Sequence, residues 1–255
     1  MSRIGVRGWL WALAMLVAAS GCVTESTGEV RKPASSAERV QAQLDLARGY
    51  IEKGNNDRAR KSLNRALEIN PRSVEAHAML GVLDEVESDW ALAEKDFKTA
   101  LSIDPKSAMA LNNYASFLYR RKRYDEAVRY LRILVKDPNY RLRSQAYESL
   151  GLAELKINEV DAAKESFTRA LQLSFSQPVS SLELAQISYD DGDIKAAASY
   201  YDGFRSQAQQ TARSLCLGMK IASELGNSDL LASYAMALNN LYPDAPETHE
   251  CIVPR

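Results

Sequence analysis

A repeat of 34 residues limits what this chain can fold into more strongly than any other feature of its sequence. The stretches ARKSLNRALEINP and AEKDFKTALSIDP lie 34 residues apart, and in each the alanines fall at the same places and a proline closes the stretch. One copy of such a unit cannot bury its apolar face alone, so successive copies must stack. The spacing therefore predicts an array of repeated units.

The repeat continues through most of the chain. Ala127 lies 34 residues after Ala93, a two-residue slip near Pro138 moves the frame to Ala163, and Ala197 follows 34 residues later. The predicted units are about 40–73, 74–107, 108–143, 144–177, 178–211 and 212–245, followed by a C-terminal tail, 246–255.

Each unit has the pattern of two helices joined by a turn. In the second unit Ala93, Phe97 and Ala100 stand at i, i+4 and i+7, so they share one face of a helix. Gly81 on the preceding helix allows close approach, and Phe97 fills the space beside it. Glycines in the segments KGN, DGD and LGN mark turns between the helices of other units.

These units resemble tetratricopeptide repeats. The resemblance implies an all-α, right-handed superhelix, or solenoid, of six repeats, whose first helices line a concave surface. It also implies that the second, fifth, ninth, twelfth and thirteenth residues of each unit face this groove. In the third unit these are Met109, Asn112, Ser116, Tyr119 and Arg120, with Asn113 beside them, and the neighbouring units add Glu75, Gln145 and Glu148.

Amides and hydroxyls in this groove are groups that hydrogen-bond extended peptide, so we expect a protein partner there. A solvated groove without a bound partner is the alternative for any one of these residues. A free C-terminal carboxylate is a poor candidate ligand, because Gln145 and Ser149 stand where the cations of a carboxylate clamp would be expected.

The N-terminus predicts export and a lipid anchor. Uncharged residues 9–20 follow Arg3 and Arg7, as in a secretory signal, and this stretch is too short to span a bilayer comfortably. The segment ASGC resembles the lipobox of bacterial lipoproteins, which implies removal of residues 1–21 and acylation of Cys22. Polar residues 22–36 form a flexible tether. The alternative is a chance cysteine after an ordinary signal.

Two further cysteines, Cys216 and Cys251, lie in and after the last unit. In an exported protein they are expected to form a disulfide, which would cap the open end of the array. The alternatives are two unpaired thiols, or a sparse thiol or metal site formed with His249. That set lacks a recognised metal-ligand spacing.

Charge and motifs argue against other classes of function. The formal net charge is −1, and it falls to −3 without Arg3 and Arg7, which is not the basic excess that nucleic-acid binding requires. The basic run at residues 120–123 is interpreted as solvated charge, except for Arg120, which ends its helix on the concave side, and His77 is interpreted as a packing residue. No phosphate-binding loop, nucleophile elbow or metalloprotease helix occurs, so we expect neither an enzyme nor a cofactor.

Together, the lipobox, the tether and the six repeats, with NNYASFLY in the third and SLGLAEL in the fourth, resemble the type IV pilus biogenesis/stability lipoproteins of the PilF/PilW family. The resemblance implies a pilotin: a lipoprotein of the outer membrane, facing the periplasm, that binds the type IV pilus secretin and promotes its localisation and multimerisation. The alternative is a repeat scaffold for cell-wall enzymes or for outer-membrane barrel assembly.

Overall fold

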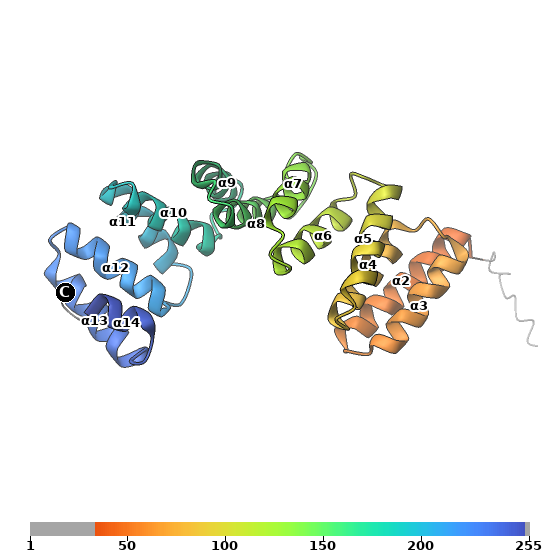
Figure 1. The fold of residues 1–255 in the computed structure, drawn as a ribbon, viewed down its shortest axis with the longest axis horizontal. Coiled ribbons are helices and arrows are strands. Elements are labelled where there is room, and N and C mark those ends of the chain that lie inside the picture. Colours follow the sequence, from red (N-terminus) through yellow and green to blue (C-terminus); the bar gives the residue numbers. More distant parts are fainter. Residues whose placement is uncertain (1–33, 253–255) are drawn as a thin grey trace, which may run out of the picture. The chain divides into compact units, whose positions relative to one another are not determined.

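The structure, a computed structural model, describes residues 34–252, so Cys22 and the predicted signal peptide lie outside the described residues. The regular elements of residues 34–252 are all helices (Figure 1). None of these helices combines the length and apolar character needed to cross a membrane. In chain order they are α2 (Ser36–Glu52), α3 (Asn56–Ile69), α4 (Val74–Val86), α5 (Trp90–Ile103), α6 (Ala108–Arg120), α7 (Tyr124–Leu134), α8 (Arg143–Lys156), α9 (Val160–Leu173), α10 (Pro178–Asp190), α11 (Ile194–Arg205), α12 (Ala212–Glu224), α13 (Ser228–Leu241) and α14 (Pro246–Ile252).

The helices from α2 to α13 pack as six successive pairs, which confirms the predicted all-α repeat fold. The two helices of a pair pack most closely with each other, and each second helix then packs against the first helix of the next pair. Helix α14 lies in the segment expected to be a tail, and it packs against α12 and α13. The last pair is therefore partly covered by a seventh unit that contains a single short helix.

The turn inside every pair has the same backbone geometry at its fifteenth position. Glycine with a positive φ, between 66° and 79°, occupies this position in the first, fifth and sixth units. In the other three units Ser88, Lys122 and Asn158 adopt φ values between 60° and 64°. Because side chains other than glycine rarely adopt this conformation, the repeat imposes the turn even where the residue does not favour it.

Close packing between the helices of a unit depends on glycine opposite an aromatic ring. A Cβ atom at Gly81 would lie 2.8 Å from the Phe97 ring, and one at Gly151 would lie 2.7 Å from the Phe167 ring. Both rings are fully buried. The predicted role of Phe97 beside Gly81 is confirmed, and the fourth unit repeats it.

Ion pairs join successive units. In most junctions between units a cation on a second helix bonds an acid in the turn of the next unit: Arg60 with Glu87, Arg132 with Glu159 and Lys164 with Asp191. Between the second and third units the signs are reversed, because Glu94 of α5 accepts from Arg123 in the next turn at 2.7 Å. The Arg123 guanidinium lowers the pKa of the Glu94 carboxyl to about 2.

The predicted slip near Pro138 corresponds to the long connection 135–142 between α7 and α8. The other connections between units are shorter: 70–73, 104–107, 174–177 and 206–211. The first helices of successive units pack closely on each other in four cases: α2 with α4, α4 with α6, α8 with α10 and α10 with α12. Within the described residues, α6 and α8 do not pack closely in this way. The extra residues therefore coincide with a gap between the first helices of the third and fourth units.

Candidate functional site

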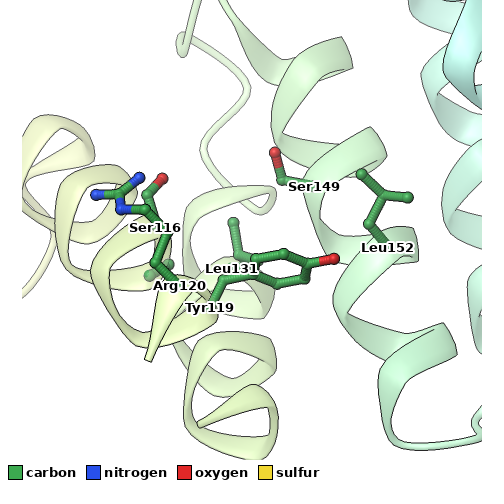
Figure 2. A pocket seen from close by; sticks show the side chains of 7 residues that line it. Ser116, Tyr119, Arg120, Leu131, Ser149 and Leu152 are labelled. Carbon is green, nitrogen blue, oxygen red and sulfur yellow. The ribbon is translucent and has the colours of Figure 1, made fainter. Parts of the chain in front are cut away.

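A cavity of about 200 Å³ occupies the gap between α6 and α8. Figure 2 shows the side chains of Ser116, Tyr119 and Arg120 from α6 on one side and those of Ser149 and Leu152 from α8 on the other. The lining residues are Ala115, Ser116, Tyr119, Arg120, Leu131, Ser149 and Leu152. We call this the α6–α8 cavity.

The α6–α8 cavity combines an apolar floor with hydroxyl groups. Ala115 and Leu131 are buried core residues and Leu152 is half-buried. The Tyr119 ring lies across the gap, with its hydroxyl directed toward α8 (Figure 2). Such a lining accepts an apolar side chain, while the hydroxyls can bond the main chain on either side of it.

The neighbourhood of Tyr119 holds its ring in place. The ring packs edge-on against Tyr124, with centroids 5.1 Å apart. Burial raises the pKa of the Tyr119 hydroxyl, and the nearby Tyr124 and Glu183 raise it further. The hydroxyl therefore remains protonated at neutral pH and is available as a hydrogen-bond donor.

Arg120 is fixed at the side of the cavity by the preceding unit. Its Nε and Nη2 atoms each donate to a carboxylate oxygen of Glu85 on α4, at 2.5 Å. A bidentate pair of this kind limits the positions that a guanidinium can take. A partner carboxylate that approached Arg120 would therefore compete with Glu85.

In the basic run that contains Arg120, Arg121 and Lys122 are exposed, in keeping with solvated charge, whereas Arg123 is half-buried. Arg121 stacks over the Trp90 ring, 4.6 Å from its centroid, and Arg123 bonds Glu94 and Glu126. Most of these partners belong to the second unit. Sequence spacing alone does not show which residues of another unit contact the basic run.

Only some of the predicted groove residues line the cavity. Tyr119 and Arg120 line the α6–α8 cavity, and the half-buried Asn112 and Asn113 lie earlier on α6, outside the lining. Gln145 is exposed on α8. The two acids bond neighbouring helices: Glu75 accepts from Arg48 of α2 at 2.7 Å, and Glu148 accepts from the backbone N–H and hydroxyl of Ser180 of α10.

Sequence reasoning missed three lining residues, Ala115, Leu131 and Leu152, and it named Ser149 only as a clamp position without a cation. Leu152 could have been found, because it holds in the fourth unit the ninth position that Ser116 holds in the third. Leu131 belongs to a second helix, and it reaches the cavity only because α6 and α8 are spread apart.

His77 and the C-terminal cysteines were the other candidate residues. The His77 ring bonds Asp96 of α5 at 2.8 Å and the Pro71 carbonyl at 3.2 Å, so it joins two helices of one unit. Cys216 of α12 is bonded to Cys251 of α14, with Cα atoms 5.8 Å apart. That this disulfide forms in the exported protein stays a prediction.

The structure does not assemble the metal site considered for Cys216, His249 and Cys251. Ligand atoms of the two cysteines lie within 4.8 Å of a Glu250 oxygen, and His249 is not part of this group. Sulfur atoms bonded to each other are not thiolates, and Glu250 accepts from Lys220 at 2.7 Å. The geometry thus favours a disulfide between α12 and α14 over metal binding.

Comparisons with known proteins identify the type of repeat. Tetratricopeptide repeat profiles match residues 40–83, 85–141 and 148–211. The type IV pilus assembly protein PilF of Pseudomonas aeruginosa is 38% identical over 237 residues, which cover 92% of this chain and 94% of PilF.

Two solved structures share the fold. A structure of Pseudomonas aeruginosa PilF superposes with a TM-score of 0.78 and 39% identity, covering 84% of this chain and 97% of that one. PilW, described as a widely conserved type IV pilus biogenesis factor, superposes with a TM-score of 0.68 and 27% identity, covering 84% and 98%. The chain therefore belongs to the family of tetratricopeptide-repeat proteins that includes the type IV pilus assembly protein PilF.

Proposed function

We propose that this chain acts in type IV pilus biogenesis as a pilotin, which binds the secretin and promotes its outer-membrane localisation and multimerisation. The observation that carries the proposal is the 38% identity with PilF over nearly the full length of both chains. The α6–α8 cavity supplies a chemically suitable docking point. No catalysis is needed for this role.

In the proposed mode of binding, an extended secretin segment crosses the gap between α6 and α8. One apolar side chain enters the cavity above Leu131 and Leu152, and the hydroxyls of Ser116, Tyr119 and Ser149 bond the peptide main chain. The helices that carry these groups are packed into the array, so little conformational entropy is lost when the segment binds.

Anchoring is the second part of the proposal. Acyl chains on Cys22 would hold the protein on the periplasmic face of the outer membrane, and residues 22–36 would tether the repeats to it. Tethering raises the local concentration of bound secretin subunits and so favours their assembly. Mass spectrometry of the purified protein tests the anchor, and an unmodified Cys22 would contradict it. Export would also place Cys216 and Cys251 where a disulfide persists.

A pull-down of the secretin from detergent extract tests the binding site. Ser149→Phe fills the cavity from a half-buried position, and we expect it to reduce secretin capture by about tenfold. Lys195→Phe is the control, because it adds the same ring at an exposed position on α11, outside the cavity and outside the predicted groove residues. Equal capture by both variants would remove the cavity from the proposal.

The same pull-down separates the pilotin from the scaffold alternative. Capture of cell-wall enzymes or barrel-assembly proteins by the wild type, without secretin, would replace the proposed function. Circular dichroism of both variants should match that of the wild type, since neither substitution changes a core residue.

A further inference from the structure

A second exposed surface, away from the α6–α8 cavity, flanks the fourth unit. Its apolar side chains lie at the two connections that bound this unit and on the helix ends beside them. Their exposed fractions are 45% for Ile133, 52% for Leu142, 47% for Leu173, 88% for Phe175 and 40% for Val179. We call these five residues the fourth-unit edge.

The two connections adjoin each other in space. The Gln177 amide, at the start of α10, donates to the Ser144 hydroxyl at the start of α8, at 3.2 Å. Leu142 lies two residues before Ser144, and Phe175 lies two residues before Gln177. The connections that carry Leu142 and Phe175 are therefore neighbours in the array.

Among the connections between units, exposed apolar side chains are specific to the two that bound the fourth unit, although Leu241 at the end of α13 is exposed like Leu173. The equivalent connections, 70–73, 104–107 and 206–211, carry no exposed large apolar side chain in the structure. Repeat folding therefore does not require such residues at this position. Apolar groups gathered on one exposed surface commonly mark a site of interaction.

Cations surround the fourth-unit edge. Lys136, Arg141 and Arg169 are exposed beside Ile133, Leu142 and Leu173 respectively. Arg169 donates to the Gln172 amide oxygen, and it shares the surface of α9 with the acids Asp161 and Glu165. The acid of the two connections is Asp137, which accepts from the Asn139 backbone N–H. The chain as a whole is nearly neutral, so the excess of positive charge in the two connections, Lys136 and Arg141 against Asp137, is local.

The surface is also hollowed beside Phe175. A cavity of about 600 Å³ is lined by Leu171 and Phe175, by Tyr200 and Gly203 of α11, and by the polar residues Thr168, Gln172, Ser181, Ser199 and Gln207. A hollow that combines apolar side chains with hydroxyl and amide groups fits a protein segment, whereas a plane of lipid headgroups would leave it unfilled.

We propose that the fourth-unit edge docks a protein segment that combines apolar side chains with aspartate or glutamate. The apolar side chains cover Leu142, Leu173 and Phe175, and the acids pair with Lys136, Arg141 and Arg169. This docking site goes beyond the proposed secretin-binding cavity and does not depend on it.

Fluorescence anisotropy tests this chemistry with a labelled amphipathic helical peptide of leucine, phenylalanine and glutamate. We expect the full mature protein to bind it, and Phe175→Ser to weaken binding by about tenfold. Arg141→Glu should weaken it by a similar factor, with a smaller dependence on salt. Met236→Ser is the matched control, because Met236 is 67% exposed on α13, far along the chain.

Several results would overturn the proposal: no binding, equal binding of a peptide with lysine in place of every glutamate, or equal losses in the Met236 and Phe175 variants. A photo-reactive phenylalanine at position 175 then identifies the occupant in living cells. A cross-link to an acidic, apolar segment of another protein supports the proposal. A cross-link to lipid, to a second copy of this chain or to nothing contradicts it. None of these readouts uses the secretin, so they can fail while secretin capture succeeds.

Discussion

The bond between Cys216 and Cys251 offers a quantitative test of how the array ends. Replacing both residues with serine removes a link across 35 residues of chain. By the chain-entropy relation, a loop of this length contributes about 4 kcal/mol at 25 °C through its restriction of the unfolded state. The last pair has a full unit on one side and only the short helix α14 on the other, so it has fewer other interactions to offset the loss.

Other contacts of α14 remain in this double variant. Thr248 is buried and bonds the Tyr242 carbonyl, and Lys220 pairs with Glu250. We therefore expect α14 to dock reversibly in the variant. Because each unit contacts only its neighbours, the loss should be confined to α12, α13 and α14.

The assay is urea unfolding followed by circular dichroism, combined with hydrogen exchange read by mass spectrometry. Amides of α12 to α14 should exchange faster in the double variant, while those of α4 to α6 should keep their wild-type rates. Cys251→Ser alone is the control for packing, because it breaks the link and leaves the buried Cys216 side chain in place. A loss below about 1 kcal/mol, uniform exchange along the chain, or two free thiols in wild-type protein would refute the reasoning.

Three further predictions concern the repeats. Gly151→Ala should lower the free energy of unfolding by about 1–3 kcal/mol, measured by urea unfolding, because the new methyl group meets the buried Phe167 ring. Lys122→Gly should raise it by about 1 kcal/mol in the same assay, since φ at this position is 60°, and an unchanged midpoint would count against strain in the turn. Glu94 has a pKa of about 2 in the folded protein and an ordinary value of 4.5, so its pairing with Arg123 stabilises fully above pH 4.5, and this contribution is lost as the pH falls toward 2. Glu94→Gln should therefore lower stability at pH 7 by about 2–3 kcal/mol and flatten its acid dependence, and parallel pH curves for variant and wild type would contradict this assignment.

Sequence periodicity predicted the helix pairs because small residues, aromatic residues and prolines recur at fixed places in each unit. The same periodicity could not predict the α6–α8 cavity. That cavity depends on how far one connection separates two helices, and a two-residue slip in the repeat marks the place without giving the separation. Helix α14 was missed because its seven residues belong to no repeat and its partners lie on other helices.

Groove residues were harder to assign than the fold. Position within the repeat places Tyr119, Glu75 and Glu148 on first helices, but it does not show which of them are already bonded within the array. Glu75 and Glu148 join neighbouring units, and only the structure shows these partners. A sequence pattern gives the direction of a side chain more readily than its partner.

Because the ion pair between the second and third units is reversed, the charges at the junctions between units match in one order of the units only. If the second unit were deleted, Arg60 would come to lie beside Arg123, and if the third were deleted, Glu94 would come to lie beside Glu159. In either shortened array like charges replace an attractive pair, and such contacts are destabilising. Units that share one fold are thus not interchangeable. An array with its units in another order is less stable, because like charges meet at the junction next to α6. The third unit, which carries five of the seven residues that line the α6–α8 cavity, is consequently held in its place by charge as well as by covalent order.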